Sequence, residues 1–562
     1  MDHQDSEMGS VRLGTSYYES LAHLSPFEIK DELIKLARAG SEHSAKAFLN
    51  AGRGNPNWIA TRAREAFFLL GQFALTEARR SYDDPVAGIA GMPPREGAHA
   101  RFTRWVGKQI ALQEEDRDVD EGIPPARTLS DAVEFAIGKF GFDADAFLHE
   151  LTDSIIGDNY PVPDRALHHN EIITHEYLMW AMCAGHRPDM KFDLYPVEGG
   201  TAAMCYIFKA LKNQRLLNAG DTIALGTPIF TPYLEMPELE DYGLHCIRVN
   251  AEQEDKFQLT EEDLTALEDP KVKALFMVNP GNPSAAAMDP DAIGRLVHFV
   301  KTRRPDLMIL TDDVYGTFVP GFESLLGHLP RNTIGVYSYS KYFGCTGWRL
   351  GVIAVAEDNI FDEKIQAHPE EIQEKLDARY RALTPKPREV RFIDRVVADS
   401  RDVALNHTSG LSLPQQVMMT LFGLVEMMDS EKIYQQSCIA ICQRRFRNLV
   451  EGMGIESNPG PYFDYYYGIV DLEFWLRKYA GDEVATWVKE NIHPLDIPFR
   501  LAEDYGIVLL NGSGFAAPNW SARVSFANLD DDAYSEIGRA IRSIARGYYQ
   551  AYQASKGERI TA

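Results

Sequence analysis

Between about residues 195 and 355, short β-rich runs alternate with segments of helical pattern. The runs are DTIALGTPIF, HCIRVNA, ALFMVNP, LMILTDDVY, TIGVYSYSK and WRLGVIAVA. Strands that alternate with helices predict a mostly parallel sheet with helices on both faces. Ligands of such sheets bind at the carboxyl ends of the strands. We therefore expect an α/β fold whose functional site lies just after these runs.

The 562-residue chain is long for a single core, and a second α/β region follows the first. That region contains a predicted long helix near 412–453, then the runs YYYGIVDLEFW, GIVLLNGSGF and ARVSFA. Ser25, with Glu28 three residues on, predicts the start of a helix. Residues 59–155 have a mostly helical pattern, and 356–405 are polar with one helical stretch. We expect a flexible leader at 1–20, an N-terminal helical segment with part of a small domain at 21–160, a large domain at 161–405 with an insertion at 356–405, and the rest of the small domain at 406–562.

Charge and cysteine content limit the classes of function. The net charge of −25 disfavours nucleic acid and anionic membrane surfaces, because both would repel the protein. No stretch reaches about 18 uninterrupted apolar residues, and the N-terminus lacks the basic and apolar regions of a secretory signal. The six cysteines form no CxxC pair, and Cys438 and Cys442 have the spacing of buried helix packing. We expect a cytoplasmic protein with reduced thiols and no metal centre.

One lysine ends the run Val336-Tyr-Ser-Tyr-Ser-Lys341, and Arg349 follows eight residues later. A lysine that forms a Schiff base needs a rigid platform and a desolvated setting that lowers its pKa. A neighbouring phosphate needs hydroxyl donors and a guanidinium group, which Ser338, Ser340 and Arg349 can supply. Together these requirements describe a pyridoxal-phosphate site. The alternative is a strand that ends in a solvated lysine before a glycine-rich turn.

Two of the other β-rich runs end in residues that such a cofactor requires. Asp312 follows the apolar run LMIL, where its carboxylate suits a protonated pyridine nitrogen. Tyr315 and Asn282 can each reach the phenolic oxygen of the ring. The alternatives are a helix cap for Asp312 and a simple turn for the segment Asn279-Pro-Gly-Asn-Pro that contains Asn282.

Three further positions complete the candidate site. Gly199-Gly-Thr201 opens a helical pattern, and backbone N–H groups at a helix N-terminus bind anions such as phosphate. Phe230 can stack on the pyridine ring, although an ordinary core position explains it equally well. Arg523, in the late strand ARVSFA, suits a substrate α-carboxylate because its guanidinium can bind in a bidentate manner. The alternative for Arg523 is a surface ion pair.

In this order, these residues resemble those of the fold-type I pyridoxal-phosphate aminotransferases of the aspartate aminotransferase group. The resemblance covers most of residues 160–355 and the region around 500–530. It implies a large domain with a mostly parallel sheet, and a smaller α/β domain built from both chain ends. It also implies catalytic roles for Lys341, as the Schiff-base lysine, and for Tyr315. The cofactor-binding residues that it implies are Gly199, Gly200, Thr201, Phe230, Asn282, Asp312, Tyr315, Ser338, Ser340, Lys341 and Arg349.

The resemblance also implies contributions from a second subunit. Tyr160 resembles the tyrosine that crosses a dimer interface to the phosphate of the neighbouring subunit. Ordinary members of the group have about 400 residues. The additional material at 59–155 and 356–405, with the segments SPFEIKDELIKLA and NAGRGNPNW, is similar to that of the L-aspartate β-decarboxylases. Those enzymes convert aspartate to alanine and CO₂, retain aminotransferase activity with 2-oxo acids, and form large homo-oligomers built from dimers, up to a dodecamer.

The substrate's second carboxylate needs a partner of its own. Arg523 would hold the α-carboxylate, and the candidates for the distal one are Arg53 and Arg401. Arg53 stands between two glycines, which allow close backbone approach to a ligand, and Arg401 follows the insertion, where a partner subunit can supply it. A surface position explains each of these two equally well, and the sequence does not decide between them.

Three competing functions remain at this point. The first is a pure aminotransferase acting on a dicarboxylic or aromatic amino acid. The second is a cofactor-binding regulator, which is disfavoured because the N-terminal region has no basic DNA-binding module. The third is an inactive homologue, which is disfavoured because Lys341, Asp312 and Arg523 are all present.

Overall fold

The computed structural model describes residues 18, 21, 24–42, 48–115, 122–160, 165–401 and 410–557. Most of the leader predicted at 1–20 therefore lies outside the described residues. Tyr18 is an exception, because it is buried and its ring stacks on His493 at 5.4 Å between centroids. The predicted helix after Ser25 is present as α2 (Pro26–Glu42).

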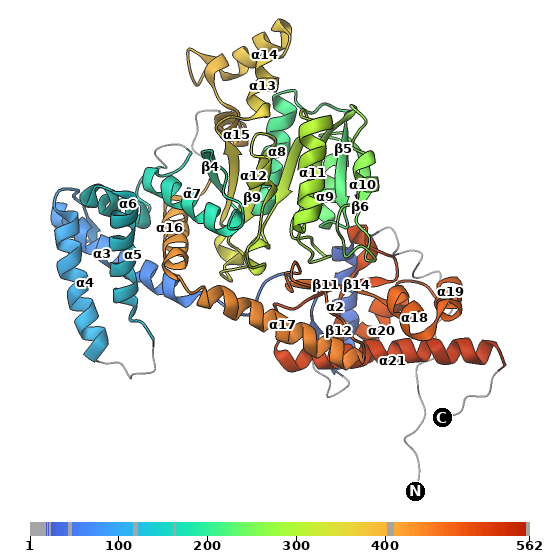
Figure 1. Ribbon diagram of the computed structural model, residues 1–562. Coiled ribbons are helices and arrows are strands. Elements are labelled where there is room, and N and C mark those ends of the chain that lie inside the picture. The colour runs from blue at the N-terminus through green and yellow to red at the C-terminus, as the bar shows by residue number, and fades with distance from the viewer. Residues whose placement is uncertain are drawn as a thin grey trace.

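A seven-stranded sheet forms the centre of the large domain (Figure 1). Its order is β4-β10-β9-β8-β7-β5-β6, and only β10 runs antiparallel to its neighbours. All six β-rich runs form strands, and the predicted α/β class is confirmed. The strands are β4 (Phe192–Val197), β5 (Thr222–Thr227), β6 (His245–Asn250), β7 (Val272–Val278), β8 (Met308–Asp312), β9 (Thr333–Ser338) and β10 (Gly351–Ala356).

Both faces of this sheet are buried along β7, β8, β9 and β10, which explains why these strands are almost continuously apolar, whereas edge strand β6 is partly exposed. Side chains along β7 alternate between the two faces. Phe276 belongs to the core that includes α8 (Gly200–Asn213), and its ring lies 5.7 Å from that of Phe208. Leu275 and Met277 belong to the core that includes α11 (Pro290–Arg303). Helices therefore cover both faces, as the alternating pattern predicts.

The small domain contains elements from both ends of the chain, as expected. Strands β11 (Tyr467–Asp471), β14 (Ser521–Ser525) and β13 (Leu510–Asn511) form an antiparallel sheet. Near the N-terminus, β1 (Leu49–Asn50) pairs in parallel with β12 (Ile507–Val508), and α2 packs against α20 (Asp496–Tyr505). Two short helices, α18 (Leu472–Ala480) and α19 (Asp482–Asn491), complete this domain, and α21 (Asp531–Ser555) runs along its lower edge in Figure 1.

The prediction of a single helix near 412–453 is wrong. The structure has two helices there, α16 (Leu413–Met428) and α17 (Ile433–Met453), which point in different directions (Figure 1). Lys432 adopts a left-handed conformation with φ 54°, and the Asp429 carboxylate accepts a hydrogen bond from the Tyr434 N–H at 2.9 Å. These features turn the chain, so that α16 packs on α7 (His168–Met182) and α17 packs on α21.

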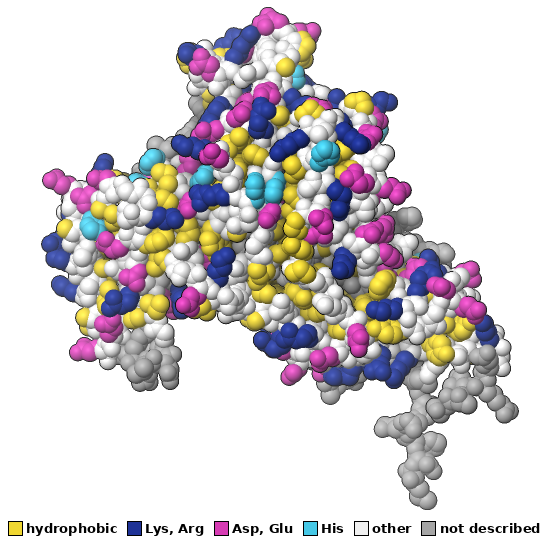
Figure 2. Space-filling view, in the orientation of Figure 1, with side chains coloured by type: hydrophobic (Ala, Val, Ile, Leu, Met, Phe, Trp, Pro, Cys, Tyr) yellow, Lys and Arg dark blue, Asp and Glu magenta, His cyan; other side chains and the backbone are white. Residues whose placement is uncertain are grey.

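The described parts of the predicted additions at 59–155 and 356–405 are mainly helical. Residues 61–115 and 122–156 form a lobe at the left of Figure 1 that packs on α16. Figure 2 shows acidic and basic side chains interspersed over this face of the molecule, with hydrophobic side chains between them. The lobe contains α3 (Thr61–Ser81), the hairpin β2 (Asp83–Asp84) and β3 (Ile89–Ala90), α4 (Ala98–Glu115), α5 (Pro125–Phe140) and α6 (Ala144–Ile156).

In the second addition, α13 (Ile360–Gln366) and α14 (Glu370–Tyr380) project at the top of Figure 1. The last helix, α15 (Phe392–Ser400), returns and packs on α8. The Gln214 amide joins the two by donating to the Asp399 carboxylate at 2.8 Å. The addition is therefore anchored to the large domain. The exact domain boundaries at 160/161 and 405/406 remain predictions.

Candidate active site

A pocket of about 410 Å³ lies at the carboxyl ends of the parallel strands, where the small domain meets the sheet. The location agrees with the rule for open α/β sheets. Its walls come from the ends of β8 and β9, the N-terminus of α8, the loop after β1, and β14. The predicted site residues that line it are Arg53, Gly200, Thr201, Phe230, Asn282, Asp312, Tyr315, Ser338, Ser340, Lys341, Arg349 and Arg523.

Lys341 points into the pocket from the segment after β9. Its Nζ donates a hydrogen bond to the Gly54 carbonyl oxygen at 3.0 Å, and the Tyr466 hydroxyl donates to the same oxygen at 2.8 Å. A Cβ on Gly54 would lie 3.0 Å from Lys341 Nζ and 2.7 Å from the Tyr467 hydroxyl oxygen. The loop after β1 therefore approaches the lysine closely because residue 54 has no side chain.

Asp312 lies at the end of β8, and its carboxylate is buried. Its Oδ2 accepts a hydrogen bond from the Tyr233 hydroxyl at 2.7 Å, and its Oδ1 accepts one from the Val314 N–H at 3.2 Å. Burial raises the pKa of Asp312 to about 6, although these hydrogen bonds and the charge of Lys341 oppose the increase. A buried carboxylate of this kind is a suitable partner for a protonated ring nitrogen.

Another part of the pocket is suited to an anion. Gly199 adopts φ +94°, and a Cβ there would lie 2.5 Å from Arg349 Nη2. Only glycine fits this position, which brings the N-terminus of α8 close to the guanidinium. The Ser338 and Ser340 hydroxyl oxygens lie 3.0 Å apart at the end of β9. Backbone N–H groups, hydroxyls and an arginine thus gather where a phosphate would bind.

Arg523 extends from β14 into the pocket and is buried. Its Nη1 donates to Asn282 Oδ1 at 3.1 Å, and its Nη2 donates to the Gly52 carbonyl oxygen at 2.9 Å. The guanidinium lies 4.3 Å from the centroid of the Tyr467 ring, and its Nε is buried without a hydrogen-bond partner among the described residues. A carboxylate ligand would give this charged donor a partner.

Two tyrosines from different domains meet beside Arg523. The Tyr315 hydroxyl donates to the Tyr467 hydroxyl oxygen at 3.3 Å, and the Asn282 amide lies 3.5 Å from the Tyr315 hydroxyl. Burial raises the pKa of Tyr315 well above its usual value. Burial also acts to raise the pKa of Tyr467, but the charges of Lys341 and Arg523 outweigh it and lower that pKa. The positive charge in the pocket therefore favours negative charge on a bound group.

The sequence analysis did not identify Tyr233, Tyr467 and Lys30, all of which line the pocket. Tyr233 follows Phe230 by three residues, and their rings meet edge to face at 5.3 Å between centroids. That spacing places both on one side of the turn after β5 and is the signal that could have indicated Tyr233. Tyr467 ends a run of three tyrosines and begins β11, and in the sequence this run predicts only a strand.

Tyr160 and Arg401 do not line the active-site pocket of their own chain. Tyr160 is 76% exposed and borders another pocket with His149 and His169. Arg401 is buried at the end of α15 and borders a third pocket with Arg165. Their contribution to the site of a neighbouring subunit remains a prediction.

This arrangement serves a cofactor with both a basic ring nitrogen and a phosphate, which is the chemistry of aminotransferases and related pyridoxal-phosphate enzymes. The model of the family described as aminotransferase class I and II matches residues 196–541, and the chain belongs to this family. The family uses pyridoxal phosphate, and three features fit it: the buried Asp312 carboxylate, the cradle that a Cβ at Gly199 would fill, and Lys341 in the same pocket.

One relative matches nearly the whole chain. It is a bifunctional aspartate aminotransferase and L-aspartate β-decarboxylase from a Pseudomonas species, 46% identical over 96% of this chain and 98% of its own length. A Thermococcus litoralis aromatic-amino-acid aminotransferase is 32% identical over 25% of this chain and 36% of its own length.

Solved structures support the fold. A Thermus thermophilus aspartate aminotransferase matches with a TM-score of 0.52 and 18% identity, over 95% of this chain and 99% of that one. A Pyrococcus horikoshii aromatic aminotransferase matches with a TM-score of 0.52 and 16% identity, over 92% and 99% of the two chains. Within the described ranges, no helix of this chain is long and apolar enough to cross a membrane.

Proposed function

We propose that this protein converts L-aspartate to L-alanine and CO₂ by β-decarboxylation, with transamination of aspartate to oxaloacetate as a side reaction. The extensive similarity to the bifunctional Pseudomonas enzyme supports this proposal. The observation that carries it is the number of cations in the pocket, because Arg53 and Lys30 are present in addition to Arg523 and the phosphate cradle. A dicarboxylic substrate requires a second positive partner, whereas a monocarboxylic substrate does not.

When bound, pyridoxal phosphate supplies an electron sink for bond cleavage next to the substrate's amino group. Asp312 keeps the ring nitrogen protonated, and the Tyr233 hydroxyl holds the carboxylate in position. Lys341 Nζ is the base that removes the Cα proton and returns a proton, and the Gly54 carbonyl orients it. Asn282 and Tyr315 would hold the phenolic oxygen of the ring, and Arg523, which donates to the Asn282 side-chain oxygen, would bind the α-carboxylate.

The distal carboxylate must be bound, but an interaction that is too strong would raise the barrier to its loss as CO₂. A full bidentate clamp would stabilise the bound substrate and disfavour loss of the carboxylate. Arg53 is exposed at the pocket wall, and no described residue forms a hydrogen bond or ion pair with its side chain. Lys30 is partly buried and lies 3.4 Å from Asp31. Of the two arginine candidates, Arg53 therefore has the better position within one chain.

The test of this assignment is Arg53→Gln. We expect the variant to lose at least ten-fold in kcat/KM for aspartate, since a charge-assisted contact contributes roughly 1.5–3 kcal/mol. Transamination between alanine and a monocarboxylic 2-oxo acid should change less than two-fold, because these substrates have no distal carboxylate. Lys30→Gln is the matched comparison. Equal losses with both kinds of substrate would exclude Arg53 as the distal-carboxylate residue.

The alternative is a pure aminotransferase for aspartate or an aromatic amino acid. The similarity to aromatic and aspartate aminotransferases supports it, but those matches cover only about a quarter of this chain. The two functions differ in their products, since only the decarboxylase releases CO₂ and alanine in excess over the cofactor.

We also propose a homo-oligomer built from dimers, up to a dodecamer, and a cytoplasmic location. The similarity to the bifunctional Pseudomonas enzyme over nearly the full length supports the assembly, because it includes both helical additions. The net charge of −25 and the free state of all six cysteines support the location.

A further inference from the structure

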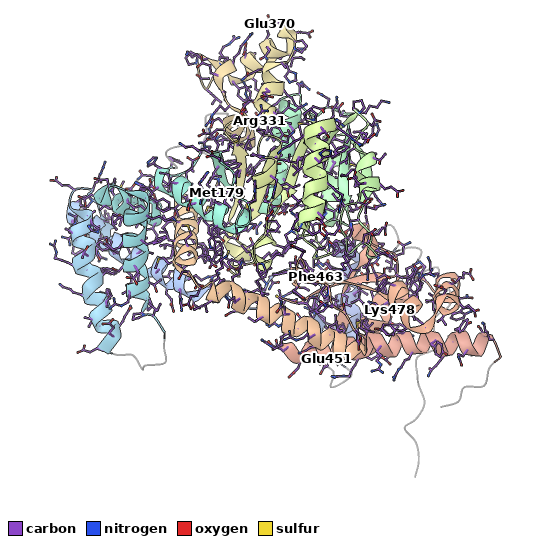
Figure 3. All side chains as sticks on the ribbon, viewed as in Figure 1. Met179, Arg331, Glu370, Glu451, Phe463 and Lys478 are labelled. Carbon is purple, nitrogen blue, oxygen red and sulfur yellow. The ribbon has the colours of Figure 1, made fainter. Side chains whose placement is uncertain are left out.

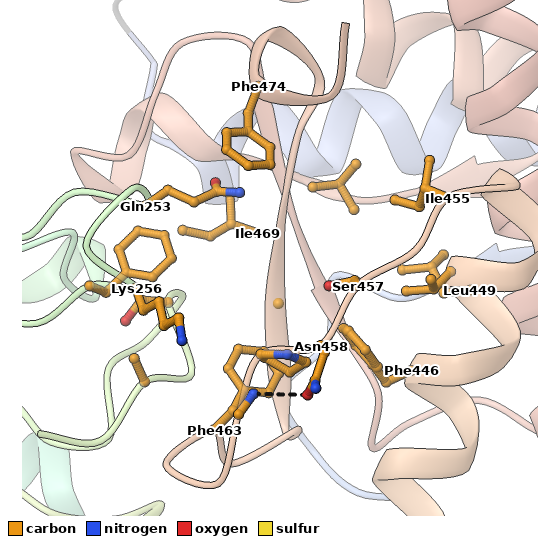
Figure 4. Close-up of a pocket in the computed structure, with 18 of the residues that line it drawn as sticks. Gln253, Lys256, Phe446, Leu449, Ile455, Ser457, Asn458, Phe463, Ile469 and Phe474 are labelled. Carbon is orange, nitrogen blue, oxygen red and sulfur yellow. Dashed lines mark hydrogen bonds between the residues drawn. The ribbon is translucent and has the colours of Figure 1, made fainter. Parts of the chain in front are cut away.

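A second pocket, of about 430 Å³, lies where the large and small domains meet (Figure 4). On the large-domain side it is bordered by residues 253–258 and by the loop that contains Ser284 and Ala286. On the small-domain side it is bordered by the end of α17, residues 455–463 and β11. It shares no lining residue with the active-site pocket and has the size of a small-molecule site.

The walls of this interdomain pocket are mostly apolar. Figure 4 shows the hydrophobic side chains of α17 and β11 facing the large-domain loop across the opening. These walls can bury an apolar ligand of roughly aromatic-ring size and remove its surface from water. The side chains that provide them are Phe446, Leu449, Phe463, Ile469, Phe474 and Trp475.

The polar groups at the large-domain edge include two that can donate to a ligand, the Gln253 side-chain amide and the Lys256 ammonium, and the Gln253 Oε1 is buried without a hydrogen-bond partner among the described residues. The amide of Gln253 is directed toward Phe474 and Ile469, and the ammonium of Lys256 reaches into the same opening (Figure 4). No described residue forms a hydrogen bond or ion pair with the Lys256 ammonium. Lys478 lies at the outer edge, 5.1 Å above the Trp475 ring.

Two acidic residues also border the pocket, and neither neutralises these donors. The Asp289 carboxylate caps α11 by accepting a hydrogen bond from the Ala292 N–H at 2.8 Å. Glu456 is exposed. Asn458 is likewise engaged, because its side-chain oxygen accepts from the Gly460 N–H at 3.3 Å. The available polar chemistry is therefore that of a site for one carboxylate.

We propose that the interdomain pocket binds a monocarboxylic acid with an aromatic or branched aliphatic body. The apolar side chains surround the body of the ligand, and Lys256 and the Gln253 amide hold its carboxylate. A dicarboxylate is a poor fit because its second charge would be buried against Phe446, Leu449 and Ile469 without a partner. The residues that form this site take no part in the reaction proposed for the active site.

The same segments that border this pocket also reach the active site. The Asp464 N–H donates to the Ala285 carbonyl oxygen at 2.8 Å, and the Ala287 N–H donates to the Tyr462 carbonyl oxygen at 2.7 Å. Asn282 lies three residues before Ala285, and Figure 3 places Phe463 at the junction of the two domains. A ligand that restrains this junction changes the affinity of the active site, and an active-site ligand must change the affinity of the pocket equally.

The test uses the cofactor-loaded enzyme with its active site saturated by maleate, a dicarboxylate that cannot transaminate. Phenylacetate is then titrated by calorimetry, and we expect one site per chain. Phenethylamine, which has the same ring but no carboxylate, should bind at least ten-fold more weakly. Lys256→Gln and Gln253→Leu should each weaken phenylacetate at least five-fold. Lys375→Gln, on the projecting helix α14, is the matched control and should leave binding unchanged.

Two further results would overturn the proposal. Loss of phenylacetate binding in the presence of maleate would place it in the active site instead. Equal affinity of the Lys256→Gln, Gln253→Leu and Lys375→Gln proteins would also exclude the interdomain pocket.

A pocket-filling variant, Val450→Trp, tests the same site without removing a charge. It should abolish phenylacetate binding while keeping the visible absorption of the bound cofactor, which reports that the protein is folded.

Coupling between the two pockets is measured as the affinity for maleate with and without phenylacetate. We expect at least a two-fold change in the unmodified protein and none in Val450→Trp. Unchanged phenylacetate affinity in Val450→Trp would contradict the location, and unchanged maleate affinity in the unmodified protein would contradict the coupling.

Discussion

The active site alters the titration of Asp312, whose carboxyl group is buried. Burial raises its pKa to about 6 from an ordinary value of 3.8, while the hydrogen bonds from Tyr233 and Val314 oppose this change. A carboxyl group with a raised folded-state pKa contributes its full stabilisation below pH 3.8. That contribution is lost as the pH rises through about 6. Without its cofactor, the protein therefore loses stability through Asp312 as the pH increases across this window.

The variant Asp312→Asn tests this titration. Between pH 5 and pH 8, the free energy of unfolding of the cofactor-free protein should fall by about 1 kcal/mol less in the variant than in the unmodified protein. Urea denaturation at the two pH values measures it. Asp313 is present in both proteins, and its pKa is raised to about 7, mainly by burial and in part by the charge of Asp312, so the difference between the proteins includes this coupling. Identical pH dependence of the two proteins would contradict the assignment.

In the cofactor-loaded Asp312→Asn protein, kcat should fall at least 100-fold, because the ring nitrogen loses its anionic partner.

Most of the individual site residues were predictable because each follows a strand in the sequence. Asp312 is the last residue of β8, Lys341 and Asn282 come just after β9 and β7, and the parallel strands bring all three to one edge. Tyr233 and Tyr467 were not predictable in the same way. Their contacts, with Asp312 and Tyr315, depend on how a turn and the small domain pack against the sheet.

At the level of elements, the start of α8 depends on Gly199. Replacement by alanine should weaken pyridoxal phosphate at least ten-fold, because φ +94° is strained for a side chain and the new Cβ would meet Arg349. Titration of the cofactor-free protein measures this affinity. Gly138→Ala in α5 is the control, since a Cβ there meets nothing within 4 Å. It should leave cofactor affinity unchanged and add up to about 1 kcal/mol of stability. Equal affinity of both variants would contradict a phosphate cradle at Gly199.

The sequence did not indicate strand β4 or the break between α16 and α17, and each has a physical reason. Strand β4 contains Asp193 and Pro196, both unusual in a strand. Pro196 is tolerated because β4 is the edge strand next to β10. Asp193 is tolerated because Arg391 pairs with it at 2.6 Å. The break between α16 and α17 was missed because the helical pattern continues through it. The turn at 429–432 depends on the contacts of Asp429 and the left-handed Lys432.

At the scale of the whole molecule, the helical lobe presents apolar side chains on its surface. Phe68 and Leu75 on α3 are 60% and 51% exposed, and Val86 in the hairpin is 97% exposed. Exposed apolar groups gathered on one unit are typical of an interface with another subunit. They support the proposed assembly of the chain beyond a dimer.

The double variant Phe68→Glu and Leu75→Glu tests this interface. Light scattering should give a mass above that of a dimer for the unmodified protein and a smaller mass for the variant, because two charges would be buried at the interface. Leu239→Glu, at a position 52% exposed on the large domain, is the control and should keep the larger mass. A dimer mass for the unmodified protein would contradict the assembly.

The central claim is that this aminotransferase-family site removes the distal carboxylate of aspartate. The most direct measurement supplies the cofactor-loaded enzyme with aspartate labelled with ¹³C at the distal carboxylate and follows labelled CO₂ and unlabelled alanine. We predict many equivalents of both per active site without added 2-oxo acid, and none from Lys341→Ala. Formation of about one equivalent of oxaloacetate per site, with no labelled CO₂ beyond its slow spontaneous loss from oxaloacetate, would contradict decarboxylation and leave a pure aminotransferase.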